Sequence, residues 1–432
     1  MTEEDSPDVI GEGLRSPRGT HDVLPPESSR WEELITRFAT LAERHGYGLA
    51  HTPTIEDARV FRRGIGEASE VVGKEMYEFD DRSGRHLALR PEGTAPIVRA
   101  FVQHRPPVPW RVWYVTPAFR YEQPQAGRYR QHHQLGVEVL GTEDPDLDVE
   151  VIALAHDFYR DLGLSSFSLR VNSLGDTTCR PQYLEDLAAY LEGVSGELCD
   201  EHRETWRRNP LRVLDCKKEA CREATKDAPL LRHQLCEPCE AHLARVLAGL
   251  DAAGVGWTAD DRLVRGLDYY TRTTFEFTGT ALESAIDAIS GGGRYDLLAE
   301  ALGGPPTPGI GFGGGIERLL QACDADGVLP VVEKVPEVFV VDVTGGAAAR
   351  DLVLALRRAG VRAERAYDGR SMKAQLKVAD RSGAALALII GPSELASGTV
   401  VVRDLRAGTQ LTEPLAALLV RAEGGQQLGG TP

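Results

Sequence analysis

The sequence lacks long apolar runs and is poor in positive charge. No stretch approaches the roughly 18 consecutive apolar residues of a membrane-spanning helix, so we expect no membrane association. The start, Met-Thr-Glu-Glu-Asp, lacks the basic and apolar segments of a signal peptide, which predicts a cytoplasmic protein with reduced cysteines. The net charge of −16 argues against nonspecific binding to nucleic acid, because phosphate contacts need Lys and Arg.

The remaining composition is that of a globular protein, with 42% hydrophobic and 26% charged residues. Its 432 residues suffice for two or three domains. Six arginines and a single acid, Glu122, lie between Arg99 and Arg130. This stretch could bind RNA phosphates, or it could be a solvated arginine-rich surface, and composition leaves both open.

Changes in composition and periodicity divide the chain into parts. Most cysteines fall in a helix-rich segment that interrupts a strand-rich core. The expected parts are a disordered N-terminus at 1–17, a core at 18–325 with a helical insertion at about 175–255, a linker at 326–335, an α/β domain at 336–423 and a flexible tail at 424–432.

Apolar periodicity predicts the main elements of these parts. We expect a helix capped by Ser28 or Ser29 and ended by Gly46, followed by extended chain at 47–61. Segments 110–119 and 129–140 predict a hairpin with a long polar loop. In the last domain we expect a largely parallel sheet from strands at 338–343, 361–367, 385–390 and 400–405 and helices at 347–359, 372–381 and 411–422.

Two polar segments could bind a small ligand. Leu89-Arg90-Pro91-Glu92-Gly93-Thr94 could hold an ammonium group, although a capped helix start at 94–102 is the simpler interpretation. Arg265 and the residues after it, Gly-Leu-Asp-Tyr-Tyr, suggest backbone close to a ligand. The equal alternative is a buried Arg265–Asp268 ion pair beside core tyrosines.

Two further segments suggest phosphate binding. Residues 119–138 place Arg120 on a strand beside a loop with two more arginines, a pattern typical of a phosphate clamp. Residues 291–296 and 309–319 read as glycine-rich turns, the second of which leads into a helix from which Arg318 could reach a nucleotide. They match neither a Walker loop nor the dinucleotide-fold spacing.

Together these segments resemble the class II aminoacyl-tRNA synthetases, and among them the histidyl-tRNA synthetases. The resemblance covers about residues 17–422 and rests on motif 1 at 52–56, motif 2 at 119–122 with its loop, motif 3 at 309–319, and the histidine-specific signatures at 17–22, 265–270 and 291–296. It implies an α+β fold: an antiparallel-sheet catalytic core with a helical insertion, plus a C-terminal α/β anticodon-binding domain. It also implies a homodimer with Pro53 at the interface.

The resemblance further implies a reaction. ATP, with Mg²⁺, activates L-histidine to histidyl-adenylate, and histidine then passes to the 3′ end of tRNA(His). Arg120, Arg265 and Arg318 are the implied catalytic residues. The implied ATP-binding residues are Arg120, Arg128 and Arg318. The implied histidine-binding residues are Glu92, Gly93, Thr94, Arg120, Gln134, Glu138, Arg265, Tyr269 and Tyr270.

The implied pairing of Glu138 and Tyr270 with imidazole is chemically sensible. Neutral imidazole has one donor and one acceptor, which a carboxylate and a phenol complement. An amino acid without this pair would leave two buried polar groups unpaired. The competing interpretation is a regulatory-subunit paralogue of ATP phosphoribosyltransferase, which typically lacks the last domain and loses the catalytic signatures; this sequence keeps both.

This sequence departs from the family at Gln123 and His132, where Arg and Phe are frequent. We expect both in the loop that meets the tRNA acceptor stem, for which Gln125, Arg128 and Arg130 are the implied contacts. Cys216, Cys221, Cys236 and Cys239 have spacing that could form a zinc site. The alternative, reduced thiols in a helical insertion, is favoured because the family does not require a metal there.

Overall fold

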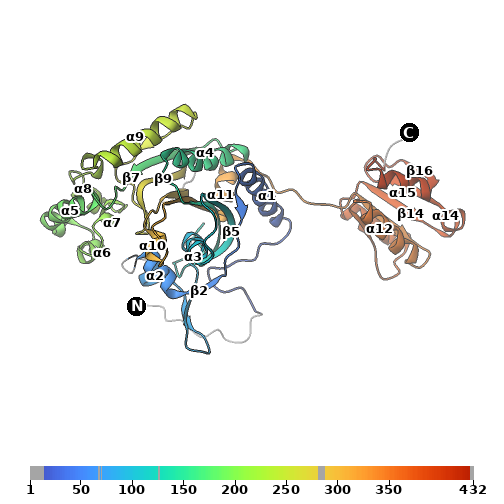
Figure 1. Cartoon of the computed structure of the whole chain (residues 1–432). Helices are drawn as coiled ribbons and strands as arrows, with labels where there is room; N and C mark the ends of the chain where they lie inside the picture. Colours follow the sequence, from blue (N-terminus) through green and yellow to red (C-terminus); the bar gives the residue numbers. More distant parts are fainter. Residues whose placement is uncertain (1–13, 67–68, 70, 125–126, 281–287, 429–432) are drawn as a thin grey trace. The chain divides into compact units, whose positions relative to one another are not determined.

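The computed structural model describes residues 14–66, 69, 71–124, 127–280 and 288–428. Its contacts divide the chain into two units, residues 1–331 and 332–432 (Figure 1). No helix among the described residues is long and apolar enough to cross a membrane.

An eight-stranded, mostly antiparallel sheet forms the centre of the first unit. Its strands, in spatial order, are β1 (Gly48–Leu49), β5 (Trp110–Phe119), β6 (Gln131–Leu140), β11 (Gly309–Gly315), β10 (Ala288–Arg294), β9 (Thr271–Gly279), β7 (Phe167–Ser173) and β8 (Thr258–Ala259). The two outermost pairs, β1–β5 and β7–β8, are parallel. A three-stranded sheet of β2 (Ile55–Asp57), β4 (His86–Leu89) and β3 (Glu78–Asp80) accompanies it.

Helices cover one face of the large sheet. These are α1 (Ser28–Arg44), α4 (Pro145–Asp161) and α11 (Ile316–Asp326), whose apolar side chains form one core with alternate strand residues. On β6 these are Leu135, Val137 and Val139, so Gln134 and Glu138 project from the opposite face. On that opposite side lie α2 (Ala58–Ile65), α3 (Thr94–His104) and α10 (Leu298–Ala301) (Figure 1). The cavity of the candidate functional site opens on this face of the sheet.

The insertion between β7 and β9 is helical, as the sequence predicts. Its helices are α5 (Arg180–Val194), α6 (Asp200–Thr205), α7 (Leu211–Leu214), α8 (Glu219–Ala224) and α9 (Glu237–Ala252). Three of them have six residues or fewer. Helices this short are unstable alone in water, so tertiary contacts or another constraint must hold them.

The second unit has a five-stranded sheet in the order β13 (Ala363–Arg365), β12 (Val338–Asp342), β14 (Leu386–Ile390), β15 (Thr399–Asp404) and β16 (Gln410–Pro414). The pairs β12–β13 and β12–β14 are parallel, whereas β15 and β16 add antiparallel strands. Its helices are α12 (Ala347–Arg358), α13 (Met372–Arg381), α14 (Pro392–Ser397) and α15 (Leu415–Glu423).

Several predicted details are wrong. No serine side chain caps α1; Ser28 and Ser29 donate their backbone N–H groups to the preceding turn at Leu24 and Pro26 instead. The extended segment at 47–61 ends early, because Asp57 accepts the Arg59 N–H and starts α2. The helix at 411–422 begins as strand β16, which completes the sheet by pairing with β15.

The prediction of glycine-rich turns at 291–296 and 309–319 differs most from the structure. Residues 288–294 and 309–315 form β10 and β11, adjacent strands in the middle of the eight-stranded sheet. Glycine is rare in such strands unless something approaches the backbone closely. The side chains that approach here are those of the site.

Candidate functional site

A cavity of about 350 Å³ opens on the sheet face opposite the covering helices. It gathers Arg120, Arg265 and Arg318, although these residues are far apart in the sequence. Its other charged or histidine lining residues are Glu122, Arg128, His132, Arg212, Asp215, Glu276 and Glu317. Such convergence of arginines creates a site for a polyanionic ligand.

Backbone carbonyls hold two of the three arginines. Arg120 Nε donates to Pro91 O at 2.9 Å, just beyond the end of β5. Arg318, in the first turn of α11, donates to Gly127 O and Ala288 O, both at 3.1 Å. These neutral acceptors fix the orientation of each guanidinium, and Arg120 also has a carboxylate nearby, since its Nη1 lies 3.9 Å from Glu122 Oε1.

Arg265 is held differently. Its guanidinium forms a close ion pair with Glu276 of β9 and lies 6.0 Å from the ring centre of Tyr270. The alternative of an Arg265–Asp268 ion pair is wrong, because Arg265 pairs with Glu276 and Asp268 accepts from Asn209 Nδ2 at 3.0 Å.

Glycines on β10 and β11 make room for the site side chains. A Cβ built on Gly291 would meet the Arg265 guanidinium at 2.0 Å, and one on Gly313 would meet the Gln134 amide at 2.4 Å. A Cβ on Gly311 would come within 1.8 Å of the Glu138 carboxylate. The site side chains therefore lie flat against bare backbone, which explains glycine in central strands.

Glu138 is fully buried in a ring of hydroxyl groups. Its carboxylate accepts hydrogen bonds from Thr94 Oγ1 at 2.6 Å, Tyr295 OH at 2.6 Å and Tyr114 OH at 3.2 Å. Burial raises the pKa of Glu138 to about 8, against the opposing effect of the hydroxyl donors. Sequence reasoning missed Tyr114 and Tyr295, which β5 and the end of β10 bring to this carboxylate.

Glu92 and its neighbours join this network. Glu92 accepts the backbone N–H groups of Thr94 at 2.5 Å and Ala95 at 2.7 Å, so the capped-helix interpretation is confirmed for α3. Burial raises the pKa of Glu92. The N–H of Gly93 donates to Gln134 Oε1 at 2.8 Å, which links the helix start to β6.

The two tyrosines after Arg265 are buried, as expected. Their ring centres are 4.6 Å apart, and Tyr269 also lies edge-on to Tyr295 at 5.9 Å. Aromatic side chains thus form one wall beside Glu138. Burial raises the pKa of both tyrosines, so they remain protonated hydrogen-bond donors at neutral pH.

The expected acceptor-stem residues are separated by the structure. His132 is not in the loop: it lies on β6 and lines the cavity, where burial and the charges of Arg120 and Arg318 lower its pKa to about 3. Gln123 is exposed, as a loop residue would be. Gln125 lies outside the described residues.

The loop arginines have partners of their own. Arg128 lines the cavity and forms a close ion pair with Glu122. Arg130 stacks on the Tyr121 ring, with its guanidinium carbon 3.9 Å from the ring centre.

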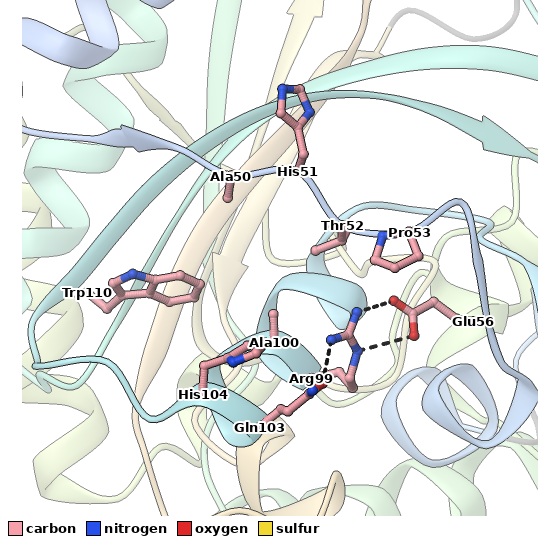
Figure 2. A pocket seen from close by; sticks show the side chains of 10 residues that line it. All are labelled: Ala50, His51, Thr52, Pro53, Glu56, Arg99, Ala100, Gln103, His104 and Trp110. Carbon is pink, nitrogen blue, oxygen red and sulfur yellow. Dashed lines mark hydrogen bonds and ion pairs between the residues drawn. The ribbon is translucent and has the colours of Figure 1, made fainter.

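Pro53 borders a second hollow, of about 590 Å³ (Figure 2). Figure 2 shows Arg99 among the lining residues, where it pairs with Glu56 and donates a hydrogen bond to Gln103 Oε1. The chain next to Pro53 is connected to β5 by Arg90, which donates to Thr52 O at 3.0 Å and to Pro117 O at 2.7 Å.

The four cysteines suggested as one zinc site do not converge. Cys216 and Cys221 lie with Cys199 and His202, whereas Cys236 and Cys239 lie with Asp176 and Cys179. The possibility of one zinc site formed by these four cysteines is therefore wrong in its grouping. Sequence spacing alone could not find this, because each group takes ligands from separate helices.

Comparisons with known proteins agree across the chain. Residues 19–319 match a family model described as histidyl-tRNA synthetase, and residues 327–421 match one described as an anticodon binding domain. Proteins named histidine–tRNA ligase from Anaeromyxobacter dehalogenans and Moorella thermoacetica are each 48% identical, covering 94% and 93% of this chain and 99% and 96% of theirs. The crystal structure of apo S. aureus histidyl-tRNA synthetase has a TM-score of 0.80 at 35% identity, covering 95% of this chain and 100% of that one.

Proposed function

The chain belongs to the histidyl-tRNA synthetase family, and from this premise we propose how its residues activate histidine. It is a histidine–tRNA ligase: it joins L-histidine to tRNA(His) at the expense of ATP. The near-complete coverage of relatives named as ligases disfavours the regulatory-subunit alternative.

One observation carries the proposed mechanism: the three arginines and the buried Glu138 network share one face of the sheet. In the first step the histidine carboxylate attacks the α-phosphorus of ATP and pyrophosphate leaves. In the second, a ribose hydroxyl of the tRNA attacks the adenylate carbonyl and AMP leaves. Neither step needs a covalent enzyme intermediate, so positioning and charge stabilisation supply the rate.

The arginines divide the phosphates between them. Arg120 holds the α-phosphate, and Arg265 contacts it from the opposite side. Arg318 contacts the γ-phosphate and the adenine, with Arg128 as a further ATP contact. The carbonyl anchors of Arg120 and Arg318 support these roles, because they orient the groups before ATP arrives.

Glu138 and Tyr270 bind the two imidazole nitrogens of histidine, with Tyr269 beside them. Their burial supports this, because a buried donor and acceptor reject side chains that cannot complete both bonds. The amino group of histidine is held by Glu92, Gly93, Thr94 and Gln134. Hydrogen bonds already connect Gly93 with Gln134, Thr94 with Glu92, and Thr94 with Glu138.

Mg²⁺, which would enter with ATP, would supply positive charge that offsets the negative charge of the phosphates. The cavity fits this ion, because Glu122, Glu276 and Glu317 line it and carboxylate oxygens are ligands that Mg²⁺ takes together with water and phosphate.

The remaining contacts concern tRNA and the partner subunit. Gln125, Arg128 and Arg130 meet the acceptor stem, and the second unit binds the anticodon. The protein acts in the cytoplasm as a homodimer, with Pro53 at the interface. The exposed apolar side chains of Leu49 and Ile55 near Pro53 support an interface there.

Histidine-dependent exchange of pyrophosphate into ATP tests the arginine roles. Arg265→Ala should lower kcat for exchange by roughly 10²–10³-fold, the usual effect of removing a group that stabilises developing charge. The exposed Arg245→Ala is the control and should match the wild type. Unchanged exchange in Arg265→Ala would refute the role, and a monomeric mass in solution would refute the homodimer.

A further inference from the structure

Two groups of metal-ligand side chains lie in and beside the helical insertion, and none of their members lines the cavity that holds Arg120, Arg265 and Arg318. The Cys199 group consists of Cys199, His202, Cys216 and Cys221, and the Cys236 group of Asp176, Cys179, Cys236 and Cys239. In each group the four ligand atoms lie within 4.8 Å of one another. We propose that each group binds one structural Zn²⁺, so that the chain carries two zinc ions.

The Cys199 group joins three of the shortest helices. Cys199 precedes α6 and His202 lies in its first turn, Cys216 follows α7, and Cys221 lies in α8. His202 Nδ1 is 3.3 Å from Cys199 Sγ and 3.6 Å from Cys221 Sγ. The backbone N–H of Cys199 points at Cys221 Sγ from 3.3 Å, the kind of bond that stabilises a metal-bound thiolate.

The Cys236 group joins the two long helices of the insertion. Cys179 and Cys236 precede α5 and α9, and Cys239 lies in the first turn of α9. Asp176 Oδ1 is 3.7 Å from both Cys179 Sγ and Cys236 Sγ. Gly175 is left-handed at φ 62°, and a Cβ there would meet Cys179 Sγ at 2.7 Å, so the backbone is shaped around this sulfur.

The donors and their spacing match zinc. Three thiolates with one imidazole or one carboxylate are a closed four-ligand set that zinc takes in structural sites. A regular tetrahedron with Zn–S bonds of about 2.3 Å has edges of about 3.8 Å. The separations of 3.3–3.7 Å between ligand atoms in the two groups need only small shifts to reach that geometry. On binding, each thiol gives its proton to solvent and no redox change occurs.

The short helices of the insertion would gain stability from a metal in addition to their packing in a hydrophobic core. Helices α6, α7 and α8 have six, four and six residues, too few to be stable alone. A metal bound by all three converts separate turns into one unit, because binding free energy becomes folding free energy.

Both groups also brace the segment that carries Arg265 and Tyr270. Arg180, next to Cys179, donates to Tyr270 O at 2.8 Å, and Asp176 pairs with Arg272 at 3.5 Å. Arg212, four residues before Cys216, donates to Gly266 O. Loss of a metal should therefore loosen this segment and raise the KM for histidine.

The first test is the metal content of the full-length protein, purified without a polyhistidine tag and dialysed against metal-free buffer. We expect inductively coupled plasma mass spectrometry to find two zinc ions per chain. Replacement by Co²⁺ should give the intense visible absorption of tetrahedral cobalt with thiolate ligands.

Single substitutions assign the ions to the groups. Cys216→Ser should lose the zinc ion of the Cys199 group and retain one zinc ion per chain. Cys236→Ser should lose the zinc ion of the Cys236 group and also retain one. The double variant should retain none. Cys323→Ser, at a buried position within α11 and outside both groups, is the matched control and should retain two.

Three results would overturn the proposal. Wild-type protein with no zinc and all seven thiols titratable would refute both sites, whether or not the variants fold. A single zinc ion lost with only one of the two substitutions would refute the other site. Bound iron with sulfide would refute zinc as the metal.

Discussion

The eight-stranded sheet of the first unit and the five-stranded sheet of the second differ in what fills their central strands. Strands β10 and β11 read Ala-Ile-Ser-Gly-Gly-Gly-Arg and Gly-Ile-Gly-Phe-Gly-Gly-Gly, whereas β12 and β14 read Val-Phe-Val-Val-Asp and Leu-Ala-Leu-Ile-Ile. Both pairs are largely buried. In the second unit aliphatic side chains fill both faces, as in sheets covered by helices. In the first unit, missing side chains leave space that charged groups from β6 and the segment before β9 occupy.

The difference extends to buried charge. The first unit buries Arg294 and Asp148 completely, along with Glu138. In the described part of the second unit, Asp342 is the buried charged residue. A sheet that must hold a site thus gives up apolar packing and depends on paired charges and hydrogen bonds, whereas a sheet without one is held by apolar contacts.

Removing one partner of the buried charge cluster should have the largest effect. Asp148 accepts from Arg294 Nε at 2.9 Å and contacts His242 of α9 at 2.8 Å. Asp148→Ala would remove the buried carboxylate that neutralises the Arg294 charge. We expect the free energy of unfolding, measured in urea, to fall by roughly 3–5 kcal/mol. The control is Asp146→Ala on the same helix, which removes an exposed pair with Arg245 and should change stability far less. Equal costs would contradict this account of the first unit.

A methyl group in the bare strand should act on catalysis instead. The three atoms nearest to a Cβ on Gly291 belong to the Arg265 guanidinium, the end of a long side chain, so Gly291→Ala should displace that guanidinium. We expect kcat for exchange to fall about 100-fold, within the range for losing one charge-stabilising group. Gly48→Ala, on a strand of the same sheet with open space at its Cβ, should leave exchange unchanged. Equal rates in both variants would show that the glycines do not serve the site.

The buried carboxyl of Glu138 should make stability depend on pH. Its pKa in the folded protein is raised from 4.5 to about 8, so the folded state keeps a proton that the unfolded chain loses. Stability from this group therefore falls as pH rises between these values. Glu138→Gln cannot ionise, so its unfolding free energy relative to the wild type should rise from pH 5 to pH 8. A difference that is constant with pH would contradict the raised pKa.

The smallest effect is expected in the second unit. Asp342 is the last residue of β12 and accepts backbone N–H groups from Thr344 at 2.6 Å and from Ala349, in the first turn of α12, at 3.0 Å. Asp342→Ala should cost about 1–2 kcal/mol in the unfolding of this unit. Histidine-dependent exchange should not change, because its chemistry lies in the first unit. Loss of exchange would show that the two units are coupled; exposed Asp351→Ala is the stability control.

The features that could be predicted from the sequence are those that depend on residues close together in the chain. The hairpin at 110–140, the helical insertion and most of the second unit follow from periodicity, and the three arginines follow from long motifs. These features were accessible because each motif contains its own signal in consecutive residues.

Features that depend on strand register were missed. Tyr114 reaches Glu138 because β5 pairs with β6, and Gly311 lies beside Glu138 because β11 pairs with β6 on its other side. Glycine runs are typical of turns, so β10 and β11 could be identified as strands only once the side chains lying over them were known. The cysteines likewise fall into two groups through the packing of separate helices.

The most direct test of the central claim is the amino-acid dependence of ATP–pyrophosphate exchange in the wild type and Glu138→Gln. We expect the wild type to exchange with histidine and not with phenylalanine or tyrosine. In Glu138→Gln the KM for histidine should rise about 10- to 100-fold, the cost of one unpaired buried hydrogen bond, while the KM for ATP stays nearly constant. Exchange supported equally by phenylalanine, or an unchanged KM for histidine in Glu138→Gln, would contradict the assignment of this buried carboxylate to substrate recognition.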